Sequence, residues 1–168
     1  MRLRIKHFLY LIILILIDQF SKYQAIIHLK DDKTITLIPK VLKLQYHEND
    51  GAVWGILSGQ IIFLVIITLV ILLLLLYLYL NIPKHKKFNA LRIFSILIAA
   101  GAIGNLIDRV IFNYVVDFIY FELINFPIFN IADSFISVSA VLLVILSIFY
   151  YSSEDFKFID DLFKVKRK

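Results

Sequence analysis

Asp117 and Asp133 are the residues of this chain best suited to catalysis. Asn130 precedes Asp133 by one helical turn, so both can lie on the same face of a helix. Two carboxylates a few ångström apart cannot both ionise readily, and they therefore share a proton. One can then take a proton from water while the other donates to a carbonyl oxygen. Taken singly, Asp117 could be a solvated loop acid, and Asp133 could complement the dipole of a helix N-terminus.

Other catalytic classes lack their characteristic residues. The chain has no cysteine, which excludes thiolate nucleophiles, disulfides and iron–sulfur ligation. Its four histidines (His7, His28, His47 and His85) are scattered along the sequence in no zinc-binding motif. Ser21 and Lys22 are adjacent and would point in different directions on a helix, so they form a poor catalytic couple. The sequence therefore predicts an acid pair that works with no metal and no other cofactor.

The composition indicates a membrane protein. Of the 168 residues, 61% are hydrophobic and only 18% are charged, whereas soluble domains have about a quarter charged residues. The net charge is +5, and the basic residues cluster at the ends of apolar runs. This pattern favours orientation in a membrane over nucleic-acid binding. At this length, one integral membrane domain covering residues 1–168 is expected.

Four apolar runs are long enough to cross a hydrocarbon layer, which takes about 20 helical residues. The first could be mistaken for a cleavable signal peptide, but Asp18 and Lys22 interrupt it and no small-residue cleavage site follows. The sequence therefore predicts an all-α membrane protein with four transmembrane helices. These helices cover residues 7–27, 61–80, 88–112 and 131–151.

The distribution of basic residues predicts the orientation of these spans. Lysine and arginine are concentrated at the N-terminus, around the connection between the second and third runs, and in the C-terminal tail, whereas residues 113–130 contain none. The positive-inside rule places both termini in the cytoplasm and the connections 28–60 and 113–130 outside. Asp117 and Asp133 would then lie near the same outer interface. Within 28–60, an alternating stretch at 42–46 and an Asn-Asp-Gly turn predict a small extracytoplasmic β element.

Charged residues inside a span are costly, and each is a candidate functional residue. Asp18 and Lys22 are one turn apart in the first span and can form an ion pair. That pair could simply hold the first helix against its neighbours. By the rise per residue, Asp18 would lie about 16 Å into the span, near the middle of the membrane.

The third span carries small and polar residues on one helical face, namely Gly101, Gly104, Asn105 and Asp108. The glycines would allow another helix to approach closely. Arg109 lies near the outer end of this span. It could pair with Asp108 or a lipid phosphate, or it could orient the substrate and the two acids.

Five short motifs occur in order along the chain, and together they resemble those of the lipoprotein signal peptidases (signal peptidase II). The patterns are D-x-x-S/T-K at residues 18–22, N-x-G-x-x-F/W at 49–54, G-A-x-G-N-x-x-D-R at 101–109, V-x-D-F at 115–118 and F-N-x-A-D at 129–133. One such motif is weak evidence, but five in order on four predicted spans are specific. The resemblance extends over essentially the whole chain.

The resemblance implies a function and roles for the motif residues. Family members are aspartic endopeptidases that remove the signal peptide from bacterial prolipoproteins, cutting just before a cysteine that carries diacylglycerol. Asp117 and Asp133 match the catalytic acids. Substrate-binding or acid-supporting roles would belong to Asn49, Gly51, Asn105, Arg109 and Asn130, and Asp18 with Lys22 would be a structural pair.

Partners and location follow from the same resemblance. The implied partners are the lipidated substrate and membrane lipid, with no metal or cofactor. The protein would be monomeric, in the bacterial cytoplasmic membrane, with its active site near the outer face. The outer segment 119–128 is short, so any flap over the site would be small.

Two other classes of protein remain open at this stage. A small transporter or channel subunit would also carry charged residues inside the membrane, but it should have polar residues through several spans. The second span has only Thr68. A membrane scaffold would have no need for two acids at one depth.

Overall fold

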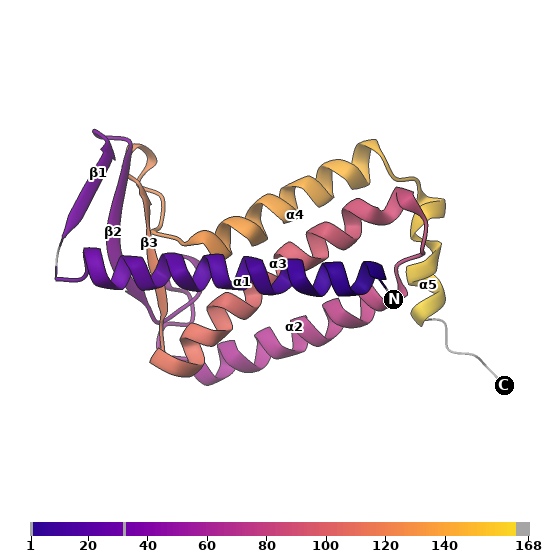
Figure 1. Cartoon of the computed structure of the whole chain (residues 1–168), viewed down its shortest axis with the longest axis horizontal. Coiled ribbons are helices and arrows are strands. Elements are labelled where there is room, and N and C mark those ends of the chain that lie inside the picture. Colours follow the sequence, from indigo (N-terminus) through magenta and orange to yellow (C-terminus); the bar gives the residue numbers. More distant parts are fainter. Residues whose placement is uncertain (1, 32, 164–168) are drawn as a thin grey trace.

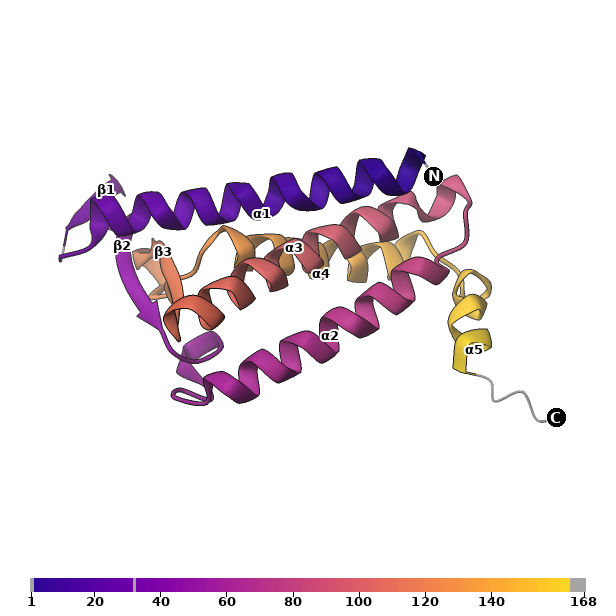
Figure 2. The same cartoon turned by 60° about the horizontal axis from the view of Figure 1, so that its bottom comes forward.

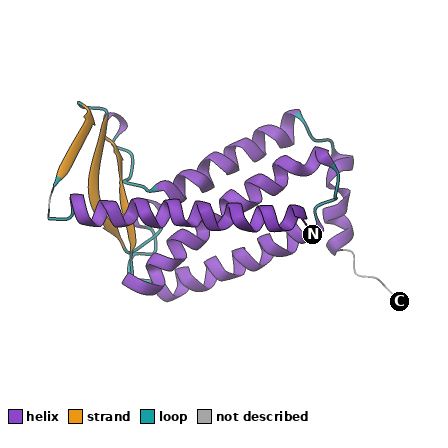
Figure 3. Cartoon of the chain, viewed as in Figure 1, coloured by secondary structure: helices purple, strands orange, loops and turns teal. Residues whose placement is uncertain are grey.

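Four long helices run side by side, and a small sheet lies across one end of them (Figures 1 and 3). The computed structural model describes residues 2–31 and 33–163. Residues 1, 32 and 164–168 lie outside the described residues, and the last of these ranges contains four of the basic residues of the C-terminal tail. The long helices are α1 (Arg2–Leu29), α2 (Ile61–Asn81), α3 (Asn89–Phe112) and α4 (Ile131–Phe149). A short helix, α5 (Lys157–Phe163), lies at the end of the bundle opposite the sheet.

The helix boundaries follow local sequence signals. α2 ends just before Ile82 and Pro83, where proline cannot continue the helical hydrogen-bond pattern. α3 ends at Asn113, which adopts the left-handed conformation common after helices. α4 begins with a capping box, in which Asn130 and Asp133 each bond to the other's backbone N–H. Asp133 therefore also caps α4. This agrees with the alternative that Asp133 stabilises a helix N-terminus.

Three of the described helical segments are long and apolar enough to cross a membrane: α2, residues 86–112 including α3, and α4. α2 is the most apolar of them, and Leu64 is its one buried residue. α1 is not among the three, and it carries Asp18 and Lys22 just past its middle. The arrangement with four spans therefore stays a prediction.

The β element is larger than predicted. β1 (Thr34–Ile38) and β2 (Leu42–Asn49) come from residues 28–60 as expected, but β3 (Val115–Phe121) comes from the later connection. The antiparallel order is β1-β2-β3, and the β2–β3 register pairs His47 with Asp117. The predicted β element in 28–60 is therefore present, and β3 adds to it a strand that was not predicted. β3 was missed because its short apolar run follows α3 directly and resembles a continuation of the membrane segment.

Close packing joins α1, α3 and α4 near the sheet. A side chain at Gly101 would collide with the Ala132 carbonyl of α4, and one at Gly104 would collide with the Asp18 carboxylate of α1. The predicted close approach at these glycines is confirmed. The last turns of α1 also pack on β3, where Ala25 and Leu29 meet Val116 and Phe118. Asp117 lies between those two core residues of β3, so the strand holds it firmly in place.

Candidate active site

The two aspartates predicted to form the site come from different kinds of element. Asp117 is in the middle of β3 and Asp133 is in the first turn of α4. Asp117 is 1% exposed, so it is not a solvated loop acid. Asp133 is half-buried. One carboxylate is thus enclosed by the fold, and the other is partly open to the surroundings.

Asparagine side chains and one backbone amide hold these two carboxylates. The Nδ2 atoms of Asn130 and Asn49 donate to Asp117 over 2.7 and 2.9 Å, one to each oxygen. Asn105 Nδ2 donates to Asp133 Oδ1 over 2.7 Å, and the Asn130 backbone N–H donates to Asp133 Oδ2 over 3.1 Å. Each carboxylate oxygen therefore accepts one hydrogen bond. Asn130 joins the two acids directly, because its side chain holds one and its backbone holds the other.

The electrostatic setting favours a proton on Asp117. Burial, and secondly the nearby charge of Asp133, raise the pKa of Asp117 from 3.8 to about 7. The hydrogen bonds from Asn49 and Asn130 act in the opposite direction but are outweighed. A carboxyl group with a pKa near 7 can both hold and release a proton at neutral pH.

A buried ionic cluster lies behind the two acids. Lys22 Nζ lies 2.9 Å from Asp18 Oδ2, 3.0 Å from Asp108 Oδ2 and 2.9 Å from Asn105 Oδ1. The predicted Asp18–Lys22 pair is therefore present, but it has a second acid as partner. An ammonium group has three donors, and all three are used here.

The cluster is attached to the neighbouring elements as well. Asp18 Oδ1 accepts from the Ala132 backbone N–H over 2.9 Å, and Asp108 Oδ2 accepts from the Val116 N–H over 3.1 Å. Ala132 and Val116 are the sequence neighbours of Asp133 and Asp117. Asp18 thus contacts the start of α4 beside the candidate acids. The prediction that Asp18 lies near the middle of the membrane stays a prediction.

Arg109 is linked to the site through a loop. Its Nη2 donates to the Gly51 carbonyl over 2.9 Å, and the Gly51 N–H donates to Asn49 Oδ1 over 3.0 Å. Asn49 in turn holds Asp117. Asp108 is occupied by Lys22, so the alternative in which Arg109 pairs with Asp108 is not what the structure shows.

A groove of about 630 Å³ lies next to Asn49 on the sheet end of the molecule. It is lined by β2, the Trp54 turn, Tyr120 near the end of β3, and the segment after β3 that contains Phe126. Trp54 is largely exposed and its ring packs edge-on against Phe126. Its lining residues do not include Asp117, but Asn49 links this partly aromatic surface to that acid.

The family model for signal peptidase (SPase) II matches residues 10–149, a range that contains α2 to α4, the sheet and both candidate acids. This chain belongs to the signal peptidase II family. It is 38% identical over 144 residues to a lipoprotein signal peptidase of Enterococcus faecalis, covering 86% of this chain and 88% of that protein. It is 44% identical over 137 residues to one of Staphylococcus epidermidis, covering 80% and 83%.

Solved structures agree with the sequence relatives. Two bacterial membrane enzymes superpose on this chain with TM-scores of 0.77 and 0.75, at 38% and 37% identity. The first match covers 85% of this chain and 87% of the other, and the second covers 87% and 94%. Membership of the signal peptidase II family implies that this chain is a peptidase, and its fold is that of a membrane enzyme.

All five motifs of this signal peptidase II member meet in one region. Asp18 and Lys22 form the ionic cluster together with Asp108 of the third motif. The last four motifs also supply the asparagines, Arg109 and the two candidate acids. Sequence reasoning missed the role of Asp108, the second partner of Lys22, and that of Gln19, which donates to Asp108 over 3.0 Å. The signal for Asp108 was available, because an acid on the glycine face of the third span needs a partner.

Proposed function

We propose that this chain is an aspartic endopeptidase that removes the signal peptide from diacylglyceryl-modified prolipoproteins, cutting before the lipidated cysteine. The observation that carries the proposal is the pair of acids joined through Asn130, whose side chain holds Asp117 and whose backbone N–H holds Asp133. Membership of the signal peptidase II family and the names of the relatives, lipoprotein signal peptidases, support the substrate class.

In the proposed reaction Asp117 and Asp133 share one proton and hold a water molecule between them. One carboxylate removes a proton from this water as it attacks the scissile carbonyl carbon, and the other carboxyl group donates its proton to the carbonyl oxygen. In the collapse of the tetrahedral intermediate, the acid that received the water proton gives it to the leaving amine. The other acid, now a carboxylate, takes a proton from a hydroxyl of the intermediate, so the pair again holds one proton. The raised pKa of Asp117 supports this scheme, because it keeps one proton on the pair near neutral pH.

The asparagines are positioning residues in this scheme. Asn105 donates to Asp133 Oδ1, and Asn49 donates to Asp117 Oδ2. Arg109 fixes the loop that follows Asn49 through the Gly51 carbonyl. The groove between Asn49, Trp54 and Phe126 would accept an extended segment of the substrate. Asp18 and Lys22 would stabilise the site from behind.

The proposed membrane arrangement has four spans, with both termini in the cytoplasm and the sheet outside, in a monomer. The apolar surfaces of α2, α3 and α4 support three of these spans. With this orientation, the acids would lie at the outer interface, where the diacylglycerol of a substrate anchors the scissile bond.

The decisive experiment compares Asp117→Asn and Asp133→Asn with wild type in detergent, using a synthetic diacylglyceryl prolipoprotein peptide. Each variant should lose cleavage, because an amide can neither accept the water proton nor share one. Asp31→Asn is a matched control, because Asp31 is an exposed acid with a positive φ that asparagine tolerates. Near-normal turnover by either active-site variant would show that the two acids are not the catalytic pair.

A further inference from the structure

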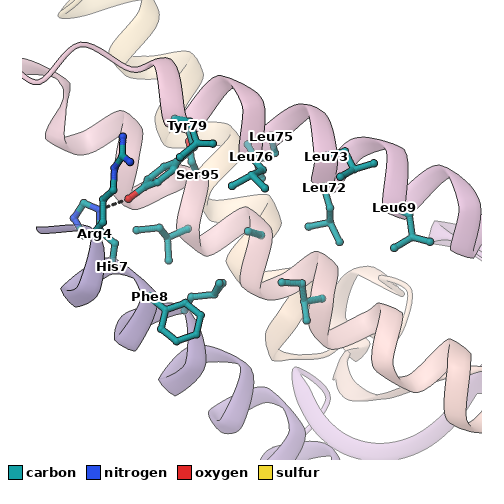
Figure 4. Close-up of a pocket in the computed structure, with 15 residues that line it drawn as sticks. Arg4, His7, Phe8, Leu69, Leu72, Leu73, Leu75, Leu76, Tyr79 and Ser95 are labelled. Carbon is teal, nitrogen blue, oxygen red and sulfur yellow. Dashed lines mark hydrogen bonds between the residues drawn. The ribbon is translucent and has the colours of Figure 1, made fainter. Parts of the chain in front are cut away.

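A second cavity lies far from the two acids, towards the α5 end of the bundle. α1 and α2 diverge from each other with α3 between them (Figure 2). The space between them forms an apolar groove of about 440 Å³, lined among others by Phe8, Leu72, Leu76, Ile96 and Ala99. Figure 4 shows a row of α2 leucines facing this groove, with Arg4, His7 and Tyr79 gathered at one end of it. Nothing in the peptidase reaction uses this cavity.

The dimensions of the groove suit one lipid chain. Its α2 wall extends from Leu69 to Leu80, a length of about 17 Å at 1.5 Å per residue. The hydrocarbon core of a bilayer is about 30 Å thick, so this wall matches roughly one leaflet. The one hydroxyl of the α3 wall, Ser95, donates to the Leu91 carbonyl within its own helix. The groove therefore presents an almost wholly apolar surface.

The end of the groove near Arg4 is positively charged. A neighbouring cavity of about 650 Å³ shares Arg4 and Tyr79 with the groove and is also lined by Lys84 and Arg92. Neither cavity has an aspartate or glutamate among its described lining residues. Arg92 is buried and donates to the Ile82 and Pro83 carbonyls, so it is committed to the chain itself.

Arg4 and Lys84 are the residues available to a ligand. Both are exposed, and within residues 2–31 and 33–163 neither forms an ion pair. They come from α1 and from the segment after α2, so they flank the opening from two sides. His7 Nδ1 and the Tyr79 hydroxyl hydrogen-bond over 2.7 Å just inside this opening and tie α1 to α2.

We propose that this groove binds one acyl chain of an anionic phospholipid, whose phosphate pairs with Arg4 and Lys84. A long apolar groove ends here at two exposed basic residues. An anionic lipid matches both features, because it has an apolar chain and a negatively charged headgroup. A zwitterionic lipid such as phosphatidylcholine also has a phosphate, but its ammonium group cancels that charge and would itself meet the two cations. The proposal depends on the membrane location of the chain and is independent of the peptidase assignment.

The test measures lipid retention by the purified full-length chain in detergent, using native mass spectrometry. The two probes are dioleoyl phosphatidylglycerol and dioleoyl phosphatidylcholine, which have the same acyl chains. The double variant Arg4→Gln/Lys84→Gln removes the charges at the opening. Its matched control, Lys33→Gln/Lys40→Gln, removes two exposed charges at the sheet end. Ala99→Leu fills the groove, and Ala140→Leu makes the same change on the exposed face of α4.

The wild-type chain should retain phosphatidylglycerol in preference to phosphatidylcholine. Each basic residue near a membrane surface contributes about 1 kcal/mol, so loss of both should weaken phosphatidylglycerol binding roughly thirty-fold. Ala99→Leu should also lose the lipid, and both control variants should keep it. Equal retention of the two lipids, or retention unchanged by Ala99→Leu, would overturn the proposal. A dimer that disappears in Ala99→Leu would assign the groove to a second copy of the chain and would also overturn it.

Discussion

The charge balance around Lys22 leads to a specific prediction about stability. Its ammonium group is 3% exposed and lies between Asp18 and Asp108, which are almost completely buried. Lys22→Met removes the only cation of this cluster and leaves two buried carboxylates side by side. Breaking a buried ion pair from one side costs about 3–5 kcal/mol, because it leaves an uncompensated charge. We expect a loss of unfolding free energy of that size.

Neutralising one acid should be milder. In Asp18→Asn, Lys22 keeps Asp108 as its partner, and the new amide oxygen can still accept the Ala132 N–H. The amide NH2 group then takes the place of the oxygen that accepted from Lys22, and it has to turn away from the ammonium group. The loss is then one charge-assisted hydrogen bond, worth about 1.5–3 kcal/mol. Asp108→Asn should behave in the same way, because its amide oxygen can keep the Val116 N–H.

The triple variant Asp18→Asn/Lys22→Met/Asp108→Asn gives the sharpest result. It contains no buried charge at this position, and replacing a whole buried ionic group is often neutral or stabilising. We therefore expect it to be more stable than Lys22→Met, although it carries two additional substitutions. Unfolding can be followed by thermal denaturation in detergent, with cleavage activity normalised to folded protein.

Two results would refute this reasoning. If Lys22→Met were as stable as wild type, or if the triple variant were less stable than Lys22→Met, the cluster would not be governed by charge compensation. A stable, abundant but wholly inactive Asp18→Asn protein would place Asp18 among the catalytic residues. We expect the opposite, with residual turnover per folded molecule. In this variant Asn130 Nδ2 still donates to Asn105 Oδ1 over 3.1 Å, so Asn105 can still hold Asp133.

Three further predictions concern the acids and their supports. The pKa of Asp117 is raised from 3.8 to about 7. Between those pH values the folded protein therefore holds a proton that the unfolded chain has released. The free energy of unfolding should fall as the pH rises through that window. Between pH 5 and pH 8, which takes in about two pH units of this window, Asp117→Asn should flatten the dependence by about 3 kcal/mol. An unchanged difference between unfolding at pH 5 and at pH 8 would contradict the assignment. Asn105→Ala removes a hydrogen bond to Asp133 and should lower turnover per folded molecule roughly ten- to hundred-fold; activity equal to that of the Asp31→Asn control would exclude a positioning role. Gly104→Ala should destabilise the protein by about 1–3 kcal/mol because its methyl group meets the Asp18 carboxylate, and thermal unfolding at the wild-type temperature would show that α1 and α3 are not closely packed there.

Local sequence signals were sufficient for much of the fold. The apolar runs predicted α2, α3 and α4 to within two residues at each end, because the breaks at Pro83 and Asn113 and the cap at Asn130 are local. α1 begins at Arg2 rather than near residue 7, since the basic residues before His7 do not interrupt a helix. β3 could not be recognised in the same way, because its pairing with β2 is a long-range contact.

The candidate site was predicted as a set of residues but not as an arrangement. Spacing along the chain suggested that Asn130 and Asp133 share a face, and they do so through the capping box. No spacing rule shows that Asn130 also reaches Asp117, or that Asn105 lies between Lys22 and Asp133. Those contacts depend on how β3, α1 and α3 pack around the start of α4.

The choice of asparagine around the two acids has an electrostatic consequence. Asn49, Asn105 and Asn130 orient the carboxylates as well as cationic side chains would, but they bring no charge. A lysine or arginine bonded directly to Asp117 would lower its pKa by 1–3 pH units, and the pair would then tend to lose its shared proton at neutral pH. The buried cation Lys22 is instead held by two acids of its own and is linked to Asp133 through the neutral amide of Asn105. Arg109 donates to the Gly51 carbonyl rather than to either candidate acid. Burial and mutual repulsion can then keep the pKa of Asp117 near 7, which is the condition that the proposed chemistry requires.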